Sequence, residues 1–140
     1  MRLVLDTNVV ASALLWGGTP WRLLLAAHDG QVRLFTSAPL LAELADILSR
    51  RKFDTKIAAS KLSVEQHIER YAALATEVAP ILVTGIAPDP DDDIVIGTAL
   101  AAHAEGIVTG DRRLLTVVEH RGASVFTVGA VLARLDHSSP

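Results

Sequence analysis

The residues Leu3-Val4-Leu5-Asp6-Thr7-Asn8 combine, within one short stretch, the two signals that set the architecture of this chain. Three consecutive apolar residues bounded by polar ones are typical of a strand that is buried on both faces. Asp6, Thr7 and Asn8 then favour a helix start, because their side chains accept hydrogen bonds from free backbone N–H groups. A buried strand that leads directly into a helix predicts a β-α-β unit and therefore a parallel sheet.

Strand and helix signals keep alternating along the rest of the chain. The further strands expected from short apolar runs are residues 32–35, 81–83, 107–109 and 125–126. The helices expected from helical periodicity are residues 9–15, 21–28, 39–50, 64–78, 92–105 and 128–135, with short helical pieces over 52–61. This order predicts one α/β domain over residues 1–140, with a mainly parallel sheet covered by helices on both faces.

The composition narrows the class of protein. Half of the residues are hydrophobic and 21% are charged, which is enough for a packed core and far from a disordered composition. The absence of cysteine excludes disulfides, thiolate zinc sites and a cysteine nucleophile. We find no signal peptide and no apolar run of the roughly 18–20 residues that span a bilayer, so we expect a cytoplasmic protein without membrane contact. A net charge of −3 argues against a dedicated high-affinity nucleic-acid binder, but it leaves a nuclease open.

Two of the expected strands end in an aspartate. Asp6 follows Leu3-Val4-Leu5, and Asp111 follows Ile107-Val108-Thr109-Gly110. In open α/β sheets, ligands bind beyond the carboxyl ends of the strands. One such aspartate on its own is more often a helix cap, whereas two on a single parallel sheet indicate a site.

Further carboxylates add to this pair. Glu43 lies at the border of the apolar stripe of its helix, where it can lean over the sheet edge, although a solvated position is equally open. Asp89, Asp91, Asp92 and Asp93 crowd one loop and helix start. Helix capping explains one or two of them. Unscreened neighbouring carboxylates repel one another by on the order of 4 kcal/mol at ~4 Å, and a bound cation removes that repulsion.

The ligand type indicates which cation. A set of oxygen ligands selects Mg²⁺, Mn²⁺ or Ca²⁺. Zinc is not expected, because the five histidines have no ligand-type spacing; each is expected to be a surface or capping residue (residues 28, 67, 103, 120 and 137). Carboxylates that hold Mg²⁺ or Mn²⁺ suit phosphoryl or phosphodiester chemistry.

The four acidic motifs together resemble the PIN domain family, nucleases common among toxins of bacterial toxin–antitoxin pairs. The resemblance covers nearly the whole chain. The matching motifs are the opening strand through Val10, Leu40-Leu41-Ala42-Glu43-Leu44, Asp89-Pro90-Asp91-Asp92-Asp93-Ile94 and Ile107-Val108-Thr109-Gly110-Asp111. Gly17-Gly18-Thr19-Pro20 and Arg51-Lys52-Phe53 are similar to a subgroup of VapC-like toxins.

The resemblance implies a three-layer α/β/α sandwich with about five strands in the order 3-2-1-4-5. It implies an endoribonuclease that uses Mg²⁺ or Mn²⁺ to cleave RNA, often a homodimer held inactive by a cognate antitoxin. The acidic positions of the family fall on Asp6, Glu43, Asp92 and Asp111 as catalytic residues and metal ligands. Thr7, Asn8 and Thr109 match polar neighbours that orient carboxylates or water.

The third motif leaves two adjacent residues as candidates for one ligand, and the fourth motif departs from the family pattern at one position. In the third motif we choose Asp92, because its distance to Thr98-Ala99 fits the family pattern, and Asp93 is the reserve. Where many relatives carry a further aspartate after the fourth motif, Arg113 stands here, so the site has one carboxylate fewer. Arg112 and Arg113 directly follow Asp111 and are candidate contacts for RNA phosphates.

Two other functions remain as alternatives. A haloacid-dehalogenase-like phosphatase also has a strand-end aspartate, but Asn8 stands where its second aspartate belongs, and its late lysine is missing, as it is for a receiver domain. A non-catalytic PIN-like module for protein contacts is the other alternative, against which the four intact acidic positions count.

Overall fold

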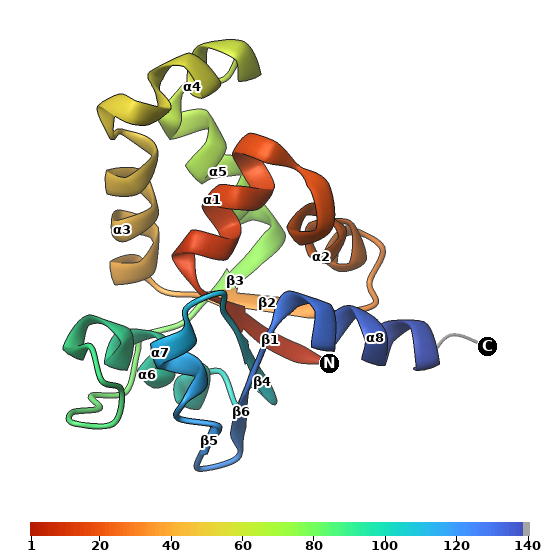
Figure 1. The fold of residues 1–140 in the computed structure, drawn as a ribbon, viewed down its shortest axis with the longest axis vertical. Coiled ribbons are helices and arrows are strands. Elements are labelled where there is room, and N and C mark those ends of the chain that lie inside the picture. The colour runs from red at the N-terminus through yellow and green to blue at the C-terminus, as the bar shows by residue number, and fades with distance from the viewer. Residues whose placement is uncertain (139–140) are drawn as a thin grey trace.

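Strand β1 (Arg2–Leu5) lies inside a six-stranded sheet with the order β3-β2-β1-β4-β6-β5 (Figure 1). We describe residues 1–138 of a computed structural model of the chain. All neighbouring strands are parallel except the pair β5–β6. The other strands are β2 (Arg33–Thr36), β3 (Ala75–Glu77), β4 (Gly106–Val108), β5 (Glu119–His120) and β6 (Ala123–Phe126).

Helices cover both faces of this sheet, as the apolar strands require. They are α1 (Thr7–Trp16), α2 (Gly18–His28), α3 (Ala38–Leu48), α4 (Asp54–Ser60), α5 (Val64–Leu74), α6 (Asp93–Ala101), α7 (Arg112–Leu115) and α8 (Val128–Ser138), with 3₁₀ turns η1 (Arg51–Phe53) and η2 (Pro90–Asp92). Leu3 and Leu5 face a core shared with α1, α2, α3, α5 and α8, whereas Val4 faces a second core shared with α6 and α7. The result is the predicted three-layer sandwich (Figure 1).

The prediction of the third strand at residues 81–83 was wrong. Helix α5 begins at the predicted place, where Ser63 and Gln66 form a capping box, but it ends at Leu74. The next three residues, which we assigned to that helix, form β3 and pair with β2. This strand is partly exposed, so its polar Thr76 and Glu77 gave no apolar strand signal.

Residues 81–83, the expected strand, instead cross the surface of α6. The backbone N–H of Ile81 donates to the carbonyl of Gly97 at 3.1 Å, and Leu82 is 89% exposed. A Cβ at residue 97 would overlap the carbonyl oxygen of Ile81. The backbone of this run therefore lies against α6 at a position that only glycine leaves open.

The edge of the sheet beyond β6 carries an element that we did not predict. β5 and β6 form a short antiparallel hairpin, in which Arg121 and Gly122 both have positive φ. The two residues of β5 are too few for a periodic signal. With β6 counted as the fifth parallel strand, the expected order 3-2-1-4-5 is confirmed.

No single helix within residues 1–138 is long and apolar enough to cross a membrane. Helices α1 and α2 together have the length and composition, but they are bent by 99° and contribute Val10, Leu23 and Leu24 to the core.

Candidate active site

Asp6 lies at the carboxyl end of β1, where the strand turns into α1. Its backbone N–H donates to the Val108 carbonyl at 2.8 Å, which ties it to the end of β4. Its Oδ2 accepts a hydrogen bond from Thr109 Oγ1 at 2.7 Å, and the residue is only 3% exposed. Burial raises the pKa of Asp6 and the charge of Asp111 raises it further, while the hydrogen bonds from Thr109 and Thr7 oppose the rise.

Thr109 links the two strand-end aspartates. Its Oγ1 donates to Asp6 and at the same time accepts from the backbone N–H of Asp111 at 3.0 Å. Asp111 Oδ1 accepts from the Arg113 N–H at 2.8 Å and so caps α7. Because β1 and β4 are neighbours, one buried hydroxyl links the Asp6 carboxylate to the backbone of Asp111 at the same edge of the sheet.

Glu43 reaches the same edge from α3. Thr7 Oγ1, at the start of α1, donates to Glu43 Oε1 at 2.9 Å. Burial raises the pKa of Glu43, the charges of Asp6 and Asp91 add to that rise, and Arg50 lowers it. The border position on the helix stripe therefore places this carboxylate over the sheet edge.

Asp92 and Asp93 are adjacent but have different surroundings. Both carboxylate oxygens of Asp93 accept backbone N–H groups of the preceding loop, from Gly85 at 3.0 Å, Ile86 at 3.3 Å and Ala87 at 2.8 Å. Asp93 is buried, and its side chain holds the loop in place. The reserve residue is thus turned away from the other acidic residues.

Asp92 is turned toward the other carboxylates. Burial raises its pKa to about 6, and the charges of Asp6, Asp111, Asp89 and Glu43 contribute in that order. Its Oδ2 is buried and has no hydrogen-bond partner. A buried carboxylate oxygen without a partner is unfavourable unless a cation or a donor reaches it.

The two arginines that follow Asp111 differ in their contacts. Arg113 Nη2 donates to Asp89 Oδ2 at 3.1 Å, and both side chains are partly exposed. Arg112 is exposed at the first position of α7. Of the two candidate RNA contacts, Arg113 therefore stabilises the acidic loop.

The oxygen donors of four carboxylates are the ligand type that a divalent cation prefers. The pKa values of Asp6, Glu43 and Asp92 are all raised by burial first and then by the charges of neighbouring carboxylates, among which Asp111 acts on Asp6 and Asp92. Across the described part of the chain, however, no three His, Cys, Asp or Glu side chains surround a common ion position. The unpartnered Asp92 Oδ2 still fits a cation, because carboxylates that repel one another are expected to stand apart until a cation draws them together.

A cavity of about 470 Å³ opens beside Asp111. Asn8 and Ser12 of α1 line one side, and Gly110 and Asp111 line the other. Asn8 is exposed here, at the first turn of α1. The cavity therefore gives solvent and a ligand access to Asp111.

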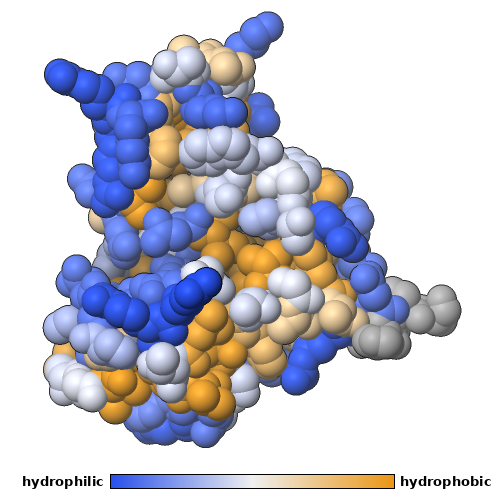
Figure 2. All heavy atoms as spheres, in the orientation of Figure 1, coloured by the Kyte–Doolittle hydropathy of each residue, from blue (hydrophilic) through white to orange (hydrophobic). Residues whose placement is uncertain are grey.

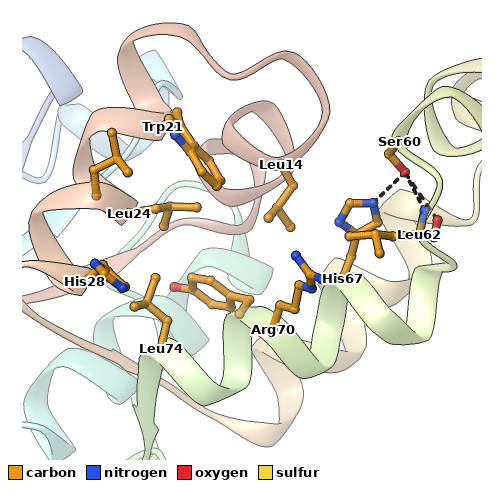
Figure 3. A pocket seen from close by; sticks show the side chains of 11 residues that line it. Leu14, Trp21, Leu24, His28, Ser60, Leu62, His67, Arg70 and Leu74 are labelled. Carbon is orange, nitrogen blue, oxygen red and sulfur yellow. Dashed lines mark hydrogen bonds between the residues drawn. The ribbon is translucent and has the colours of Figure 1, made fainter.

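A second, mainly apolar cavity of about 450 Å³ lies between α2 and α5 (Figure 3). No carboxylate lines it. His67 lies in its wall and is buried, with its Nε2 2.9 Å from Ser60 Oγ, and burial lowers its pKa. The expectation that every histidine is a surface or capping residue was wrong for His67, because it occupies an apolar position of α5; the side chain of His137 lies outside the described residues.

Comparison with known proteins gives one matching family and a similar solved structure. A family model for the PIN domain matches residues 2–113, a range that includes all four carboxylates. The fold is similar to a chain in the crystal structure of VapBC2 from Rickettsia felis bound to a DNA fragment from their promoter. The two chains are 16% identical and superpose with a TM-score of 0.61 over 91% of this chain and 98% of that one. No curated protein matches the chain in sequence.

Proposed function

The chain belongs to the PIN domain family, and from this membership we propose that it is a metal-dependent endoribonuclease, the toxin of a toxin–antitoxin pair. The observation that carries the proposal is the buried, unpartnered oxygen of Asp92 beside three further carboxylates. Such a group is a poor structural element and a good ligand for a cation.

Asp6, Glu43, Asp92 and Asp111 would hold Mg²⁺ or Mn²⁺. When bound, such an ion neutralises phosphate charge and lowers the pKa of water that attacks a phosphodiester. Thr109 keeps Asp6 and Asp111 in register, since its hydroxyl contacts both residues. Thr7 holds Glu43 through its hydroxyl.

Two residues at the rim would meet the substrate. Asn8 lines the cavity beside Asp111 and can hydrogen-bond RNA or an ordered water. Arg112 is exposed next to Asp111 and is the better candidate for a phosphate contact, because Arg113 already pairs with Asp89.

We also propose a cognate antitoxin protein as partner, a homodimer as the assembly and the cytoplasm as the location. The antitoxin is supported by the structural likeness to a chain of VapBC2, which was crystallised on promoter DNA. The homodimer and the location follow from the family resemblance and the composition alone.

The positions of the lysines and of Asn8 in the structure also argue against the phosphatase alternative. All three lysines lie in residues 52–61, where Lys52 is over Phe53 and Lys56 is over Trp16. Asn8 is exposed on α1 instead of supplying a second acid. A haloacid-dehalogenase-like reaction would therefore lack both of its usual partners for the strand-end aspartate.

The test is cleavage of defined RNAs by purified protein. We expect cleavage with Mg²⁺ or Mn²⁺, none in excess EDTA, and none with Asp6→Asn. Glu69→Gln removes an exposed carboxylate of α5 outside the site and serves as the matched control. Turnover of a small phosphomonoester without RNA cleavage would favour the phosphatase, and neither activity would favour the protein-contact module.

A further inference from the structure

Trp16 is a large aromatic side chain that remains 54% exposed at the end of α1. Its ring meets Phe53 of η1 edge to face, with centroids 5.5 Å apart. Lys56 Nζ lies 5.3 Å from the Trp16 ring centroid, and Lys52 Nζ lies 5.0 Å from that of Phe53. We call this surface the basic–aromatic patch; it consists of Trp16, Arg50, Arg51, Lys52, Phe53 and Lys56.

The patch concentrates positive charge in a chain that is acidic as a whole. Residues 50–61 hold five of the thirteen Lys and Arg residues and a single carboxylate, Asp54, although the net charge of the chain is −3. Figure 2 shows strongly hydrophilic side chains over α3 and the start of α4. Arg50 has an exposed partner, Asp46, at 4.0 Å, a separation at which an ion pair is weak. The charge of the patch is therefore open to a polyanion.

The patch lies within one helix length of the carboxylate site. Trp16 ends α1 ten residues after Asp6, about 15 Å along the helix axis. Arg50 lies two residues beyond the end of α3, and Glu43 lies five residues before that end, about 8 Å along the axis. Arg50 is close enough to Glu43 to lower its pKa. A chain that enters the carboxylate site along α3 would thus pass the patch.

We propose that the basic–aromatic patch is the platform for single-stranded RNA next to the cleavage site, with a base stacked on Trp16 and phosphates on Lys52 and Lys56. The proposal rests on the proposed ribonuclease function. Base–aromatic stacking tolerates any sequence, and lysines neutralise phosphates. Lys56 has a flexible stem, so its ammonium moves from the ring to a phosphate when a base takes its place.

Binding in EDTA tests the platform separately from cleavage. The measurement is the fluorescence anisotropy of a labelled oligouridylate with wild type, Trp16→Leu, Trp16→Phe and the double variant Lys52→Gln/Lys56→Gln. Trp21→Leu and Arg22→Gln, which change exposed residues of α2, are matched controls. Melting temperatures verify that each variant is folded.

We expect Trp16→Leu to weaken binding roughly 5- to 150-fold, the range for one stacked base. Trp16→Phe is expected to retain most of the affinity. The double lysine variant is expected to lower the slope of log K against log salt by about 1.4, or about 0.7 for each phosphate contact on a single strand. The α2 controls are expected to bind like wild type.

Other results overturn the platform or the function separately. If folded Trp16→Leu and the double lysine variant both bind RNA as tightly as wild type does, the platform proposal is refuted. Intact RNA cleavage in these variants would leave the ribonuclease proposal standing. RNA binding that depends on Trp16, without any cleavage in Mn²⁺, supports the platform and overturns the nuclease. Equal competition by polyglutamate, insensitive to Trp16→Leu, overturns the platform in favour of an acidic protein partner.

Discussion

Replacing Asp92 by asparagine is expected to stabilise the metal-free protein near neutral pH while abolishing activity. The pKa of Asp92 is raised from 3.8 to about 6 by burial and by neighbouring carboxylates, Asp6 first among them. The folded protein therefore holds a proton on Asp92 more tightly than the unfolded chain does. In wild type, the stability gained from this tighter protonation is complete below about pH 4 and is lost as pH rises through about 6. The Asp92→Asn variant has no carboxylate to ionise, so it does not lose stability in this way.

The size of the effect follows from the same pKa. At ~1.4 kcal/mol for each pH unit, the ceiling is roughly 3 kcal/mol. Asp92 is only partly buried, so solvent screening reduces the gain to on the order of 1 kcal/mol. For a chain of 140 residues, this corresponds to a rise in melting temperature of roughly 3 °C.

The assay is urea unfolding in EDTA at about pH 4 and at about pH 7.5, where the electrostatic gain is expected only at the higher pH. Asp91→Asn changes an exposed neighbour and is expected to shift stability by less than about 0.5 kcal/mol. Added Mn²⁺ is expected to stabilise wild type by about 2.7 kcal/mol at a concentration 100 times the dissociation constant, and the Asp92 variant by much less. An Asp92→Asn protein that loses stability equally at both pH values would refute the repulsion argument.

The remaining predictions concern the cation, the loop and the helix that carry the site. EDTA is expected to abolish RNA cleavage and Mn²⁺ to restore it, and full cleavage in excess EDTA would contradict a carboxylate-held metal. Asp93→Asn is expected to lower stability by roughly 1.5–3 kcal/mol in urea unfolding, because a charged acceptor of three backbone N–H groups is lost; an unchanged midpoint would mean that the loop does not need this charge. Gly97→Ala is expected to destabilise by roughly 1–3 kcal/mol, since its Cβ overlaps the Ile81 carbonyl, and a neutral effect in thermal unfolding would show that the loop moves freely.

Much of the fold could be predicted from local sequence. The run Leu3-Val4-Leu5 with its polar end specified a buried strand and the following helix, since two-sided burial demands apolar residues at every position. Ser63 specified the start of α5 through its capping box. The loss of helical structure after Leu74 was not predictable in this way, because β3 forms through its pairing with β2 and its own residues are polar.

The sequence by itself determined which residue types reach the carboxyl edge of the sheet, because strand-end aspartates follow directly from where the apolar runs stop. Only the tertiary structure gave Asp92 and Asp93 their different surroundings. Adjacent residues at a helix start diverge by ~100°, so one side chain faces the other carboxylates and the next one faces the loop. Which one does so depends on where the N–H groups of residues 85–87 lie. These groups meet Asp93, and in the segment just before them the Ile81 N–H donates to the Gly97 carbonyl of α6. That contact joins segments sixteen residues apart, and no local pattern encodes it.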